Sequence, residues 1–302
     1  MSDAELRLRP ATADDSEPCY RLFWESITDL AARNGTPWEG TADERWPVFT
    51  DLYALLVEIA AEWWVAEGGD GELVGYARSV AREAGSFLEL SEFFVRPGSQ
   101  ASGVGRALLD RAFPVGRGSV RAIIATGDVR AQSRYHRAGT SIQFPILGMT
   151  GTARADAADD LALDAEPVQE GHLPEIADLE RSIVGFARGD HELRWLVERR
   201  EGWRYRRDAS TVGYAFVGRG GVGPIAAVEP ELMPAVLAHV EARAAAIGRE
   251  EIGFEVPAPA VPAIRHLLDR GYRFDPFVTY LMANRAFGRF DRFLGFTPPF
   301  VL

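Results

Sequence analysis

The chain has 302 residues, of which 47% are hydrophobic and 25% are charged, as is typical of a globular protein. This length suits two domains of ordinary size. No apolar run approaches the roughly 18 residues that span a membrane, and the acidic start at residues 1–5 lacks the apolar core of a signal peptide. The net charge of -11 argues against general nucleic-acid binding. We therefore expect a cytoplasmic protein that binds neither nucleic acid nor a membrane.

The residues that commonly bind metals give no pattern. Cys19 is the only cysteine, which excludes a disulfide framework and a cysteine metal site. His136 and His191 have no neighbours at a spacing typical of metal ligands. We expect no metal.

The first half of the chain alternates strand patterns with helix patterns. Thr12 or Asp14 is suited to cap the first helix, and Thr41 or Asp43 the second, which we expect to be interrupted near Pro47. Strands are expected over 6–10, 63–67, 73–80, 86–95, 122–125 and 142–149, and helices over 12–33, 41–62, 103–113 and 131–137.

The segment 93–109 carries the most specific motif. An apolar strand runs into a turn with the pattern Gln-x-x-Gly-x-Gly, and the turn opens directly into a helix. Gly103 and Gly105 have no Cβ, so another group can approach the backbone closely. The free N–H groups at a helix start favour an anion. The spacing is neither that of a Rossmann turn nor that of a P-loop, so the segment predicts a phosphate cradle of another class.

This motif closely resembles the acetyl-CoA pyrophosphate loop of the GCN5-related N-acetyltransferases, the GNAT superfamily. That family reads Val-x-Pro, a short gap, Gln/Arg-x-x-Gly-x-Gly/Ala and a Leu-rich helix, which here are Val95, Pro97, Gln100, Gly103, Gly105, Leu108 and Leu109. The resemblance implies that acetyl-CoA is the co-substrate. It implies that the donor is held by Phe94, Val95, Gln100, Ala101, Ser102, Gly103, Val104, Gly105 and Arg106.

The charge distribution agrees with a polyanionic ligand at this loop. Residues 96–137 contain 8 arginines and only two acids, Asp110 and Asp128, although the whole chain is acidic. A basic segment around the loop attracts a phosphate-bearing molecule.

After an Ala- and Asp-rich linker at 152–163, the strand and helix patterns of the second half follow the same order as those of the first half. No glycine occurs between Glu229 and Ile247, and bulky Met233, Val236 and Leu237 stand where a phosphate would approach. We therefore expect an α/β protein that is a tandem of two GNAT folds, each a mixed, mostly antiparallel sheet flanked by helices. The expected domains are 1–151, which binds acetyl-CoA and is catalytic, and 164–302, a degenerate copy with an aromatic tail.

Three side chains are candidates for proton transfer. Glu89 and Glu92 lie on the strand before the loop, and either is a possible general base, directly or through water. We expect a β-bulge at 93–95 that frees a backbone N–H for the oxyanion. The family pattern Asn-x-x-Ala-x-x-x-Tyr-x-x-x-Gly-Phe is matched at Tyr135, with Asp128 in place of Asn and Thr140 in place of Phe. By this resemblance, Tyr135 protonates the CoA thiolate.

The acceptor is expected beside the first two helices, which mix aromatic residues with acids and so suit a cationic amine. These residues are Trp24, Trp38, Trp46, Phe49, Tyr53, Glu25, Asp29, Glu39, Asp43 and Glu44. The expected function is direct acetyl transfer to the amine of a small molecule by a monomer or homodimer. A non-catalytic acyl-CoA-binding module, which would not need Tyr135, and an enzyme with a hydroxyl acceptor are the alternatives.

Overall fold

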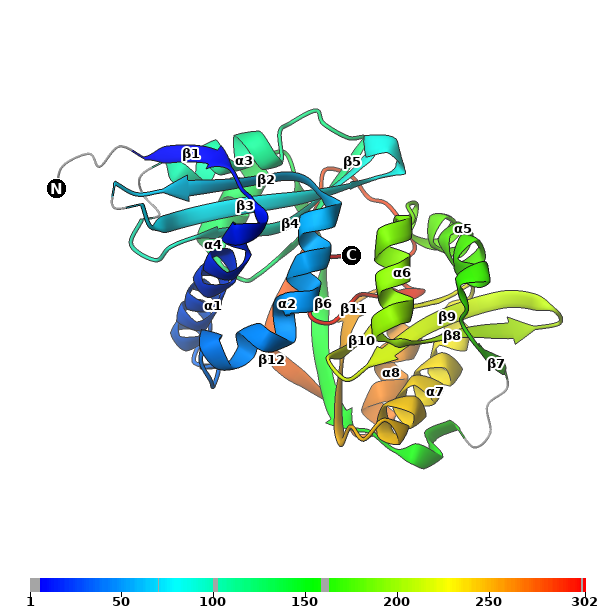
Figure 1. The fold of residues 1–302 in the computed structure, drawn as a ribbon. Coiled ribbons are helices and arrows are strands. Elements are labelled where there is room, and N and C mark those ends of the chain that lie inside the picture. Colours follow the sequence, from blue (N-terminus) through cyan, green and yellow to red (C-terminus); the bar gives the residue numbers. More distant parts are fainter. Residues whose placement is uncertain (1–5, 70, 100–102, 159–162, 300) are drawn as a thin grey trace. The chain divides into compact units, whose positions relative to one another are not determined.

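The structure is a computed structural model that describes residues 6–69, 71–99, 103–158, 163–299 and 301–302 (Figure 1). The expected donor residues Gln100, Ala101 and Ser102 lie outside the described residues. So do 159–162 of the expected linker and Phe300 of the tail.

The chain divides into two compact units. Unit 1 comprises Met1–Ser141 with Met282–Arg285, and unit 2 comprises Ile142–Leu281 with Ala286–Leu302. The elements of unit 1 are β1 (Arg7–Pro10), α1 (Ser16–Arg33), α2 (Ala42–Ile59), β2 (Ala60–Glu67), β3 (Leu73–Arg82), β4 (Phe87–Val95), α3 (Val104–Ala112), β5 (Val120–Ala125) and α4 (Val129–Arg137).

The sheet of unit 1 has the order β1-β2-β3-β4-β5. The first four strands are antiparallel, and β5 runs parallel to β4. Successive residues of β3 point to opposite faces. A Cβ on Gly75 would lie 3.0 Å from Leu108 Cδ1 of α3, whereas the Tyr76 hydroxyl meets the Glu92 carboxylate to which Tyr53 of α2 also donates. The helices α2 and α3 therefore cover opposite faces of the sheet.

Helix α2 begins with a capping box. The Thr41 N–H donates to Glu44 Oε2 at 2.8 Å, and the Glu44 N–H donates to Thr41 Oγ1 at 3.3 Å. The expected interruption near Pro47 is wrong, because α2 runs unbroken from Ala42 to Ile59. Pro47 lies in the second turn, where it removes a single N–H donor to an early carbonyl.

Unit 2 repeats the element order of unit 1, which confirms the expected tandem organisation. It contains β6 (Ser141–Thr152), β7 (Asp164–Pro167), α5 (Leu173–Val184), α6 (Asp190–Arg199), β8 (Glu201–Arg207), β9 (Ser210–Gly218), β10 (Gly221–Ala227), α7 (Met233–Ala246), β11 (Glu251–Pro257), α8 (Val261–Asp269), β12 (Arg273–Ala283) and β13 (Phe293–Leu294). One sheet has the order β13-β10-β9-β8-β7.

The division between the units differs from the expected end of the first domain at residue 151. Strand β6 pairs antiparallel with β11, from Thr152↔Glu251 to Ile146↔Pro257, and so belongs to unit 2. In unit 1, the Arg121 N–H donates to Asn284 Oδ1 at 2.8 Å, and the Asn284 N–H donates back to the Arg121 carbonyl at 3.1 Å. Each unit thus includes a segment from the other half of the sequence, and long-range pairing of this kind leaves no local sequence signal.

The carboxyl group of Glu255 in unit 2 is expected to make the stability of the protein depend on pH. Burial, and secondarily the charge of Asp275, raises the pKa of Glu255 from 4.5 to about 7. Between these values the folded chain keeps a proton that the unfolded chain has lost, so the unfolding free energy falls as the pH rises. Glu255→Gln has no carboxyl group to titrate, so its unfolding free energy should not show this fall with pH. The difference in unfolding free energy, variant minus wild type, should therefore be larger at pH 8 than at pH 5 by on the order of 1–2 kcal/mol, because solvent screens part of the effect. Thermal unfolding of both proteins at both pH values tests this, and a difference in Tm that is equal at pH 5 and pH 8 would contradict it.

Candidate functional site

A cavity of about 550 Å³ lies in unit 1 where β4 and β5 diverge. The parallel ladder between these strands runs from Phe87↔Val120 to Leu90↔Ile123. Beyond the last pair, the cavity is lined by Ser91 and residues 93–95 of β4 and by Ile124 of β5. Beyond this pair the two strands no longer bond to each other, and the backbone groups on their facing edges point towards the cavity.

The expected β-bulge is present, but it lies at Ser91 and not at 93–95. Glu92 pairs with Arg78 of β3, and Leu90 pairs with Ser79, which leaves Ser91 as the extra residue. The prediction relied on the break in apolar alternation at Phe93 and Phe94. Both side chains line the cavity, so this break does not mark a change of face. A bulge disrupts the ladder locally, and here it does so at the edge of the cavity.

The turn after β4 leads into the N-terminus of α3. Gly103 is the N-cap residue and has φ +82°, a conformation that favours glycine. Among the described residues, nothing lies within 4 Å of the position of a Cβ on Gly103, which leaves this helix start open. The first N–H groups of α3 have no intrahelical partner, and together they form a site suited to a phosphate.

The other expected donor residues near this turn have different surroundings. A Cβ on Gly105 would lie 2.9 Å from Arg134 Nη1 and 3.1 Å from Phe93 Cζ. Gly105 therefore allows the close approach of these two side chains, which the sequence analysis missed. The side chain of Val104 is buried in the core of unit 1, and Arg106 is exposed, 3.6 Å from Asp110.

Tyr135 of α4 lines the same cavity. Its side chain is 6% exposed and packs edge-on against Phe93, with ring centroids 5.9 Å apart. Burial raises the pKa of Tyr135 well above its usual value near 10, so the hydroxyl keeps its proton at neutral pH. Thr140 ends the helix by donating its N–H and its Oγ1 to the Tyr135 carbonyl at 3.1 and 2.9 Å.

Residues 18–140 match the model of the acetyltransferase (GNAT) family. The match runs from α1 to the residues just after α4. The cavity, the open start of α3 and Tyr135 all lie within the matched GNAT region. A search of the curated proteins finds no match to this sequence.

Solved structures with the same fold extend the similarity to the whole chain. A putative acetyltransferase from Pyrococcus horikoshii is 15% identical, with a TM-score of 0.70 over 97% of this chain and 94% of that one. A GCN5-related N-acetyltransferase from Sphaerobacter thermophilus is 17% identical, with a TM-score of 0.64 over 96% and 98%. A tandem GNAT protein from the clavulanic acid biosynthesis pathway is 15% identical, with a TM-score of 0.54 over 92% of this chain and 98% of that one. The expected tandem GNAT fold is thus confirmed.

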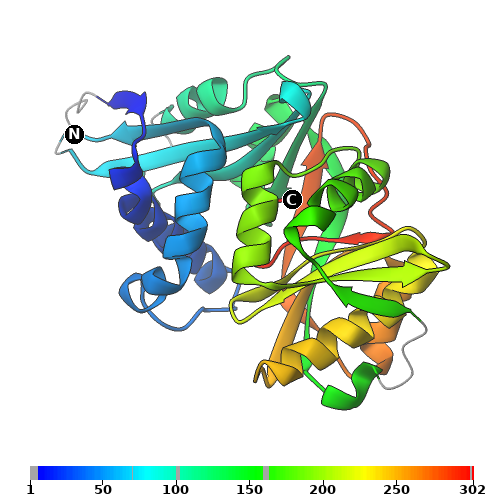
Figure 2. The same cartoon turned by 45° about the vertical axis from the view of Figure 1, so that its right-hand side comes forward.

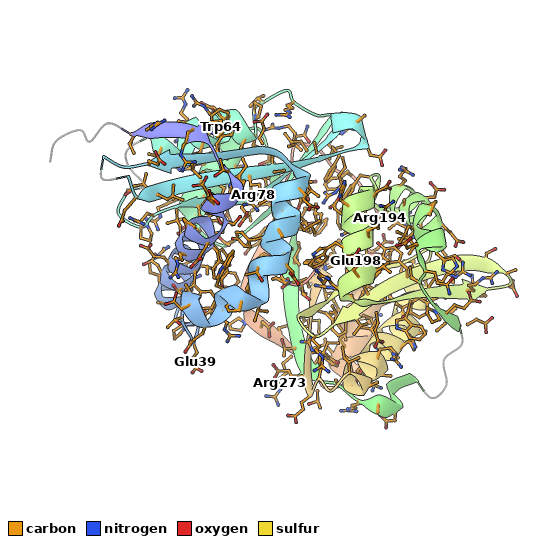
Figure 3. All side chains as sticks on the ribbon, viewed as in Figure 1. Glu39, Trp64, Arg78, Arg194, Glu198 and Arg273 are labelled. Atoms are coloured by element: carbon orange, nitrogen blue, oxygen red, sulfur yellow. The ribbon has the colours of Figure 1, made fainter. Side chains whose placement is uncertain are left out.

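The two candidate bases of the GNAT unit do not line the cavity. Glu89 is buried and accepts a hydrogen bond from Arg82 Nη1 at 2.8 Å. Glu92 is also buried and lies 3.1 Å from Arg78 Nη1, the side chain labelled in Figure 3. Tyr53 and Tyr76 donate to Glu92 Oε1 at 2.7 and 2.8 Å. Each carboxylate is engaged by a buried arginine and neither lines the cavity, so both roles as base remain predictions that the geometry does not favour.

The sequence analysis missed Arg78 and Tyr76. Both residues stand on β3 two positions apart and so point to the same face. Arg78 is fully buried and its guanidinium lies 4.0 Å from the ring centroid of Trp63. A buried arginine requires a compensating charge, and this rule could have paired Arg78 with a buried acid on the neighbouring strand.

The aromatic residues expected around the acceptor pack against one another. Ring centroids are 5.2 Å apart for Tyr20 and Trp46, 5.1 Å for Tyr20 and Phe49, and 6.0 Å for Trp24 and Trp38. The five expected aromatic residues are not part of the cavity lining, and among the expected acids only Asp29 is. The α1 side of the cavity is formed instead by Ser26, Ile27, Asp29, Leu30 and Arg33.

Charged side chains connect α1 to the start of α4 along the cavity. Arg33 lies 2.9 Å from Asp29 and 3.2 Å from Asp128, and Arg130 lies 3.3 Å from the same Asp128 oxygen. Helix α4 also contributes Arg134 and Arg137 to the cavity lining, in addition to Arg130. Since each acid is matched by arginine, the lining is basic overall, which suits a polyanionic ligand.

Asp128 also caps α4, so we expect its replacement by alanine and by asparagine to reduce stability by different amounts. Its Oδ1 accepts from the Arg130 N–H at 2.8 Å. Asp128→Ala removes this acceptor and is expected to cost about 1 kcal/mol of stability. Asp128→Asn keeps an acceptor and loses only partly exposed ion pairs, so its cost should stay below about 0.5 kcal/mol. Urea unfolding compares the two, and equal losses would mean that the ion pairs matter more than the cap.

In the part of the chain that the structure describes, no three His, Cys, Asp or Glu side chains are grouped as a metal site would require. No described helix combines the length and apolar character needed to cross a bilayer.

Proposed function

We propose that this chain transfers an acetyl group from acetyl-CoA directly to the amine of a small molecule. The observation that carries the proposal is a cavity between the diverging strands β4 and β5 that is also lined by the buried phenol of Tyr135, with the open N-terminus of α3 at the end of the turn that follows β4. These three features correspond to holding an extended donor, binding its phosphates and supplying a proton.

In the proposed reaction the acceptor nitrogen attacks the thioester carbonyl carbon, and the carbon–sulfur bond then breaks. The amine releases one proton to solvent, and the departing thiolate takes one from the Tyr135 hydroxyl, which is reprotonated from solvent. We expect a backbone N–H beside the bulge at Ser91 to stabilise the oxyanion. The only cysteine, Cys19, is buried and its pKa is raised well above the usual value by burial, which disfavours an acetyl-cysteine intermediate.

A screen for thiol release tests the function. Purified protein is incubated with acetyl-CoA and one small amine at a time, and free thiol is measured against a reaction without acceptor. We expect at least one amine to raise the rate, with the N-acetyl product identified by mass spectrometry. Binding of acetyl-CoA without acceptor-dependent release would favour a non-catalytic binding module, and acetylation of alcohols alone would replace the amine by a hydroxyl acceptor.

From the open start of α3 we predict which substitution weakens binding of the acetyl donor. A side chain at Gly103 would occupy the space before the first N–H groups of α3, so we expect Gly103→Val to weaken acetyl-CoA binding at least tenfold. Gly116 has a similar φ of +90° and equally open surroundings among the described residues, but it lies in a turn after α3 and not at the start of a helix. Gly116→Val therefore carries a comparable backbone strain and should keep the wild-type Kd. Equal weakening in both variants would show that strain, and not the phosphate cradle, is responsible.

A further inference from the structure

The strands of unit 2 that correspond to β4 and β5 are not paired with each other. By element order these counterparts are β10 and β11. Strand β11 pairs with β6, whereas β10 pairs with β9 on one edge and with β13 on the other. The tail strand β13 thus occupies the edge of β10 that corresponds to the edge of β4 facing the cavity.

The tail binds β10 by main-chain pairing. Leu294 pairs with Ile225, and Phe293 with Ala226, in antiparallel register. The Ala227 N–H donates to the Arg292 carbonyl at 3.0 Å, and the Thr297 N–H donates to the Val222 carbonyl at 3.0 Å. Figure 2 shows this segment in red beside the yellow-green strands of unit 2.

The side chains of β13 fill the space towards β11. Phe293 and Leu294 are each 1% exposed. Leu294 belongs to the same core cluster as Ile252 and Phe254 of β11, and β13 contacts β11 as well as β10. The tail therefore lies between the two strands whose counterparts in unit 1 diverge around the cavity.

Glycines in β10 make room for the tail backbone. A Cβ on Gly223 would collide with the Gly295 carbonyl oxygen, and one on Gly221 would collide with the Thr297 carbonyl oxygen. The counterpart strand β4 carries bulky residues at 93–95 where it lines its cavity. The glycines of β10 are thus matched to an occupant that approaches as closely as another strand.

A buried arginine joins the tail to this edge. Arg200 Nη1 donates to the Gly223 carbonyl at 2.7 Å, and its Nη2 donates to the Thr297 carbonyl at 2.8 Å. The guanidinium lies 4.0 Å from the ring centroid of Phe296. Hydrogen bonds from a buried charge to two carbonyls are costly to break, so the tail is anchored.

We propose that residues 292–297 are a built-in occupant of the slot between β10 and β11, which closes the second unit to an acyl donor and leaves the chain with one cavity of this kind. The closure is permanent: the tail completes the sheet of unit 2 and is not displaced by acetyl-CoA. The inference concerns unit 2 alone and holds whichever ligand the cavity of unit 1 takes.

Hydrogen exchange measured by mass spectrometry tests the proposal on the full chain. In the wild type we expect slow exchange for peptides covering 222–227 and 292–297, unchanged by saturating acetyl-CoA. Gly223→Ala directs a methyl group at the Gly295 carbonyl, so exchange in both peptides should accelerate at least tenfold. Gly248→Ala is the matched control, because Gly248 has a φ of +84° against +86° for Gly223 and nothing within 4 Å of its Cβ position.

Three outcomes would overturn the proposal. Exchange of the wild-type 292–297 peptide at the rate of an unstructured chain would mean that the tail does not occupy the slot. Faster exchange of this peptide on addition of acetyl-CoA would make the tail displaceable and the slot a second donor site. Equal acceleration in Gly223→Ala and Gly248→Ala would attribute the effect to backbone strain. The first two outcomes need only the wild type, so the test survives if a variant fails to fold.

Discussion

Replacing Tyr135 with phenylalanine is expected to lower kcat for acetyl transfer by about 10²- to 10⁴-fold, the contribution typical of a positioned general acid. The substitution removes only the hydroxyl, so the ring still packs against Phe93 and the KM for acetyl-CoA should change little. Because burial holds the pKa of Tyr135 above its usual value, the wild-type enzyme should not lose activity through this group up to about pH 9. Steady-state kinetics across pH measure all three quantities.

Tyr272→Phe in unit 2 is the control for Tyr135. Tyr272 is also buried, and burial raises its pKa as well, but it lies outside unit 1. We expect wild-type kcat in this variant. A similar loss in both variants would indicate a general effect on folding, and an unchanged kcat in Tyr135→Phe would mean that the thiolate is protonated by another group or by water.

Replacing Glu92 with alanine is expected to destabilise the protein by about 3–5 kcal/mol, because it leaves a buried arginine without its counter-charge. Arg78 is fully buried, and Tyr53 and Tyr76 would lose their common acceptor at the same time. Urea unfolding followed by fluorescence measures the loss. Asp110→Ala is the control, because its ion pair with Arg106 is largely exposed and should contribute less than about 1 kcal/mol.

Glu92→Gln separates a structural role from the predicted role as base. The amide keeps an acceptor for the two tyrosine hydroxyls but cannot take a proton, so a structural role predicts a partial loss of stability with kcat close to wild type. A variant that keeps the wild-type Tm and loses acetyl transfer would restore Glu92 as the general base, acting through water.

Local patterns in the sequence were sufficient for the type and order of most elements and for the fold. The strand–turn–helix motif around Gly103 indicated the family whose model matches residues 18–140, and the helix pattern that followed singled out Tyr135, which lines the cavity. Each signal is local, the first a strand, turn and helix start and the second a single helix with its exit, and at this range residue spacing and geometry are closely linked.

Features that depend on distant segments could not be predicted in this way. The pairing of β6 with β11, and of β10 with the tail strand β13, joins residues far apart in the sequence. The burial of Glu92 depends on Tyr53 of α2 and Arg78 of β3, which reach it only through the folded sheet. An isolated acid on an alternating strand has the same sequence signal whether it is a base or part of a buried ion pair.

Isothermal titration calorimetry of the wild-type chain with acetyl-CoA tests the central claim most directly. We predict one binding site per chain, located in unit 1, with the slot of unit 2 closed by its own tail. No measurable binding would contradict the proposed donor and with it the acetyltransferase activity. Two sites per chain would leave the activity of unit 1 in place and contradict the closed slot of unit 2.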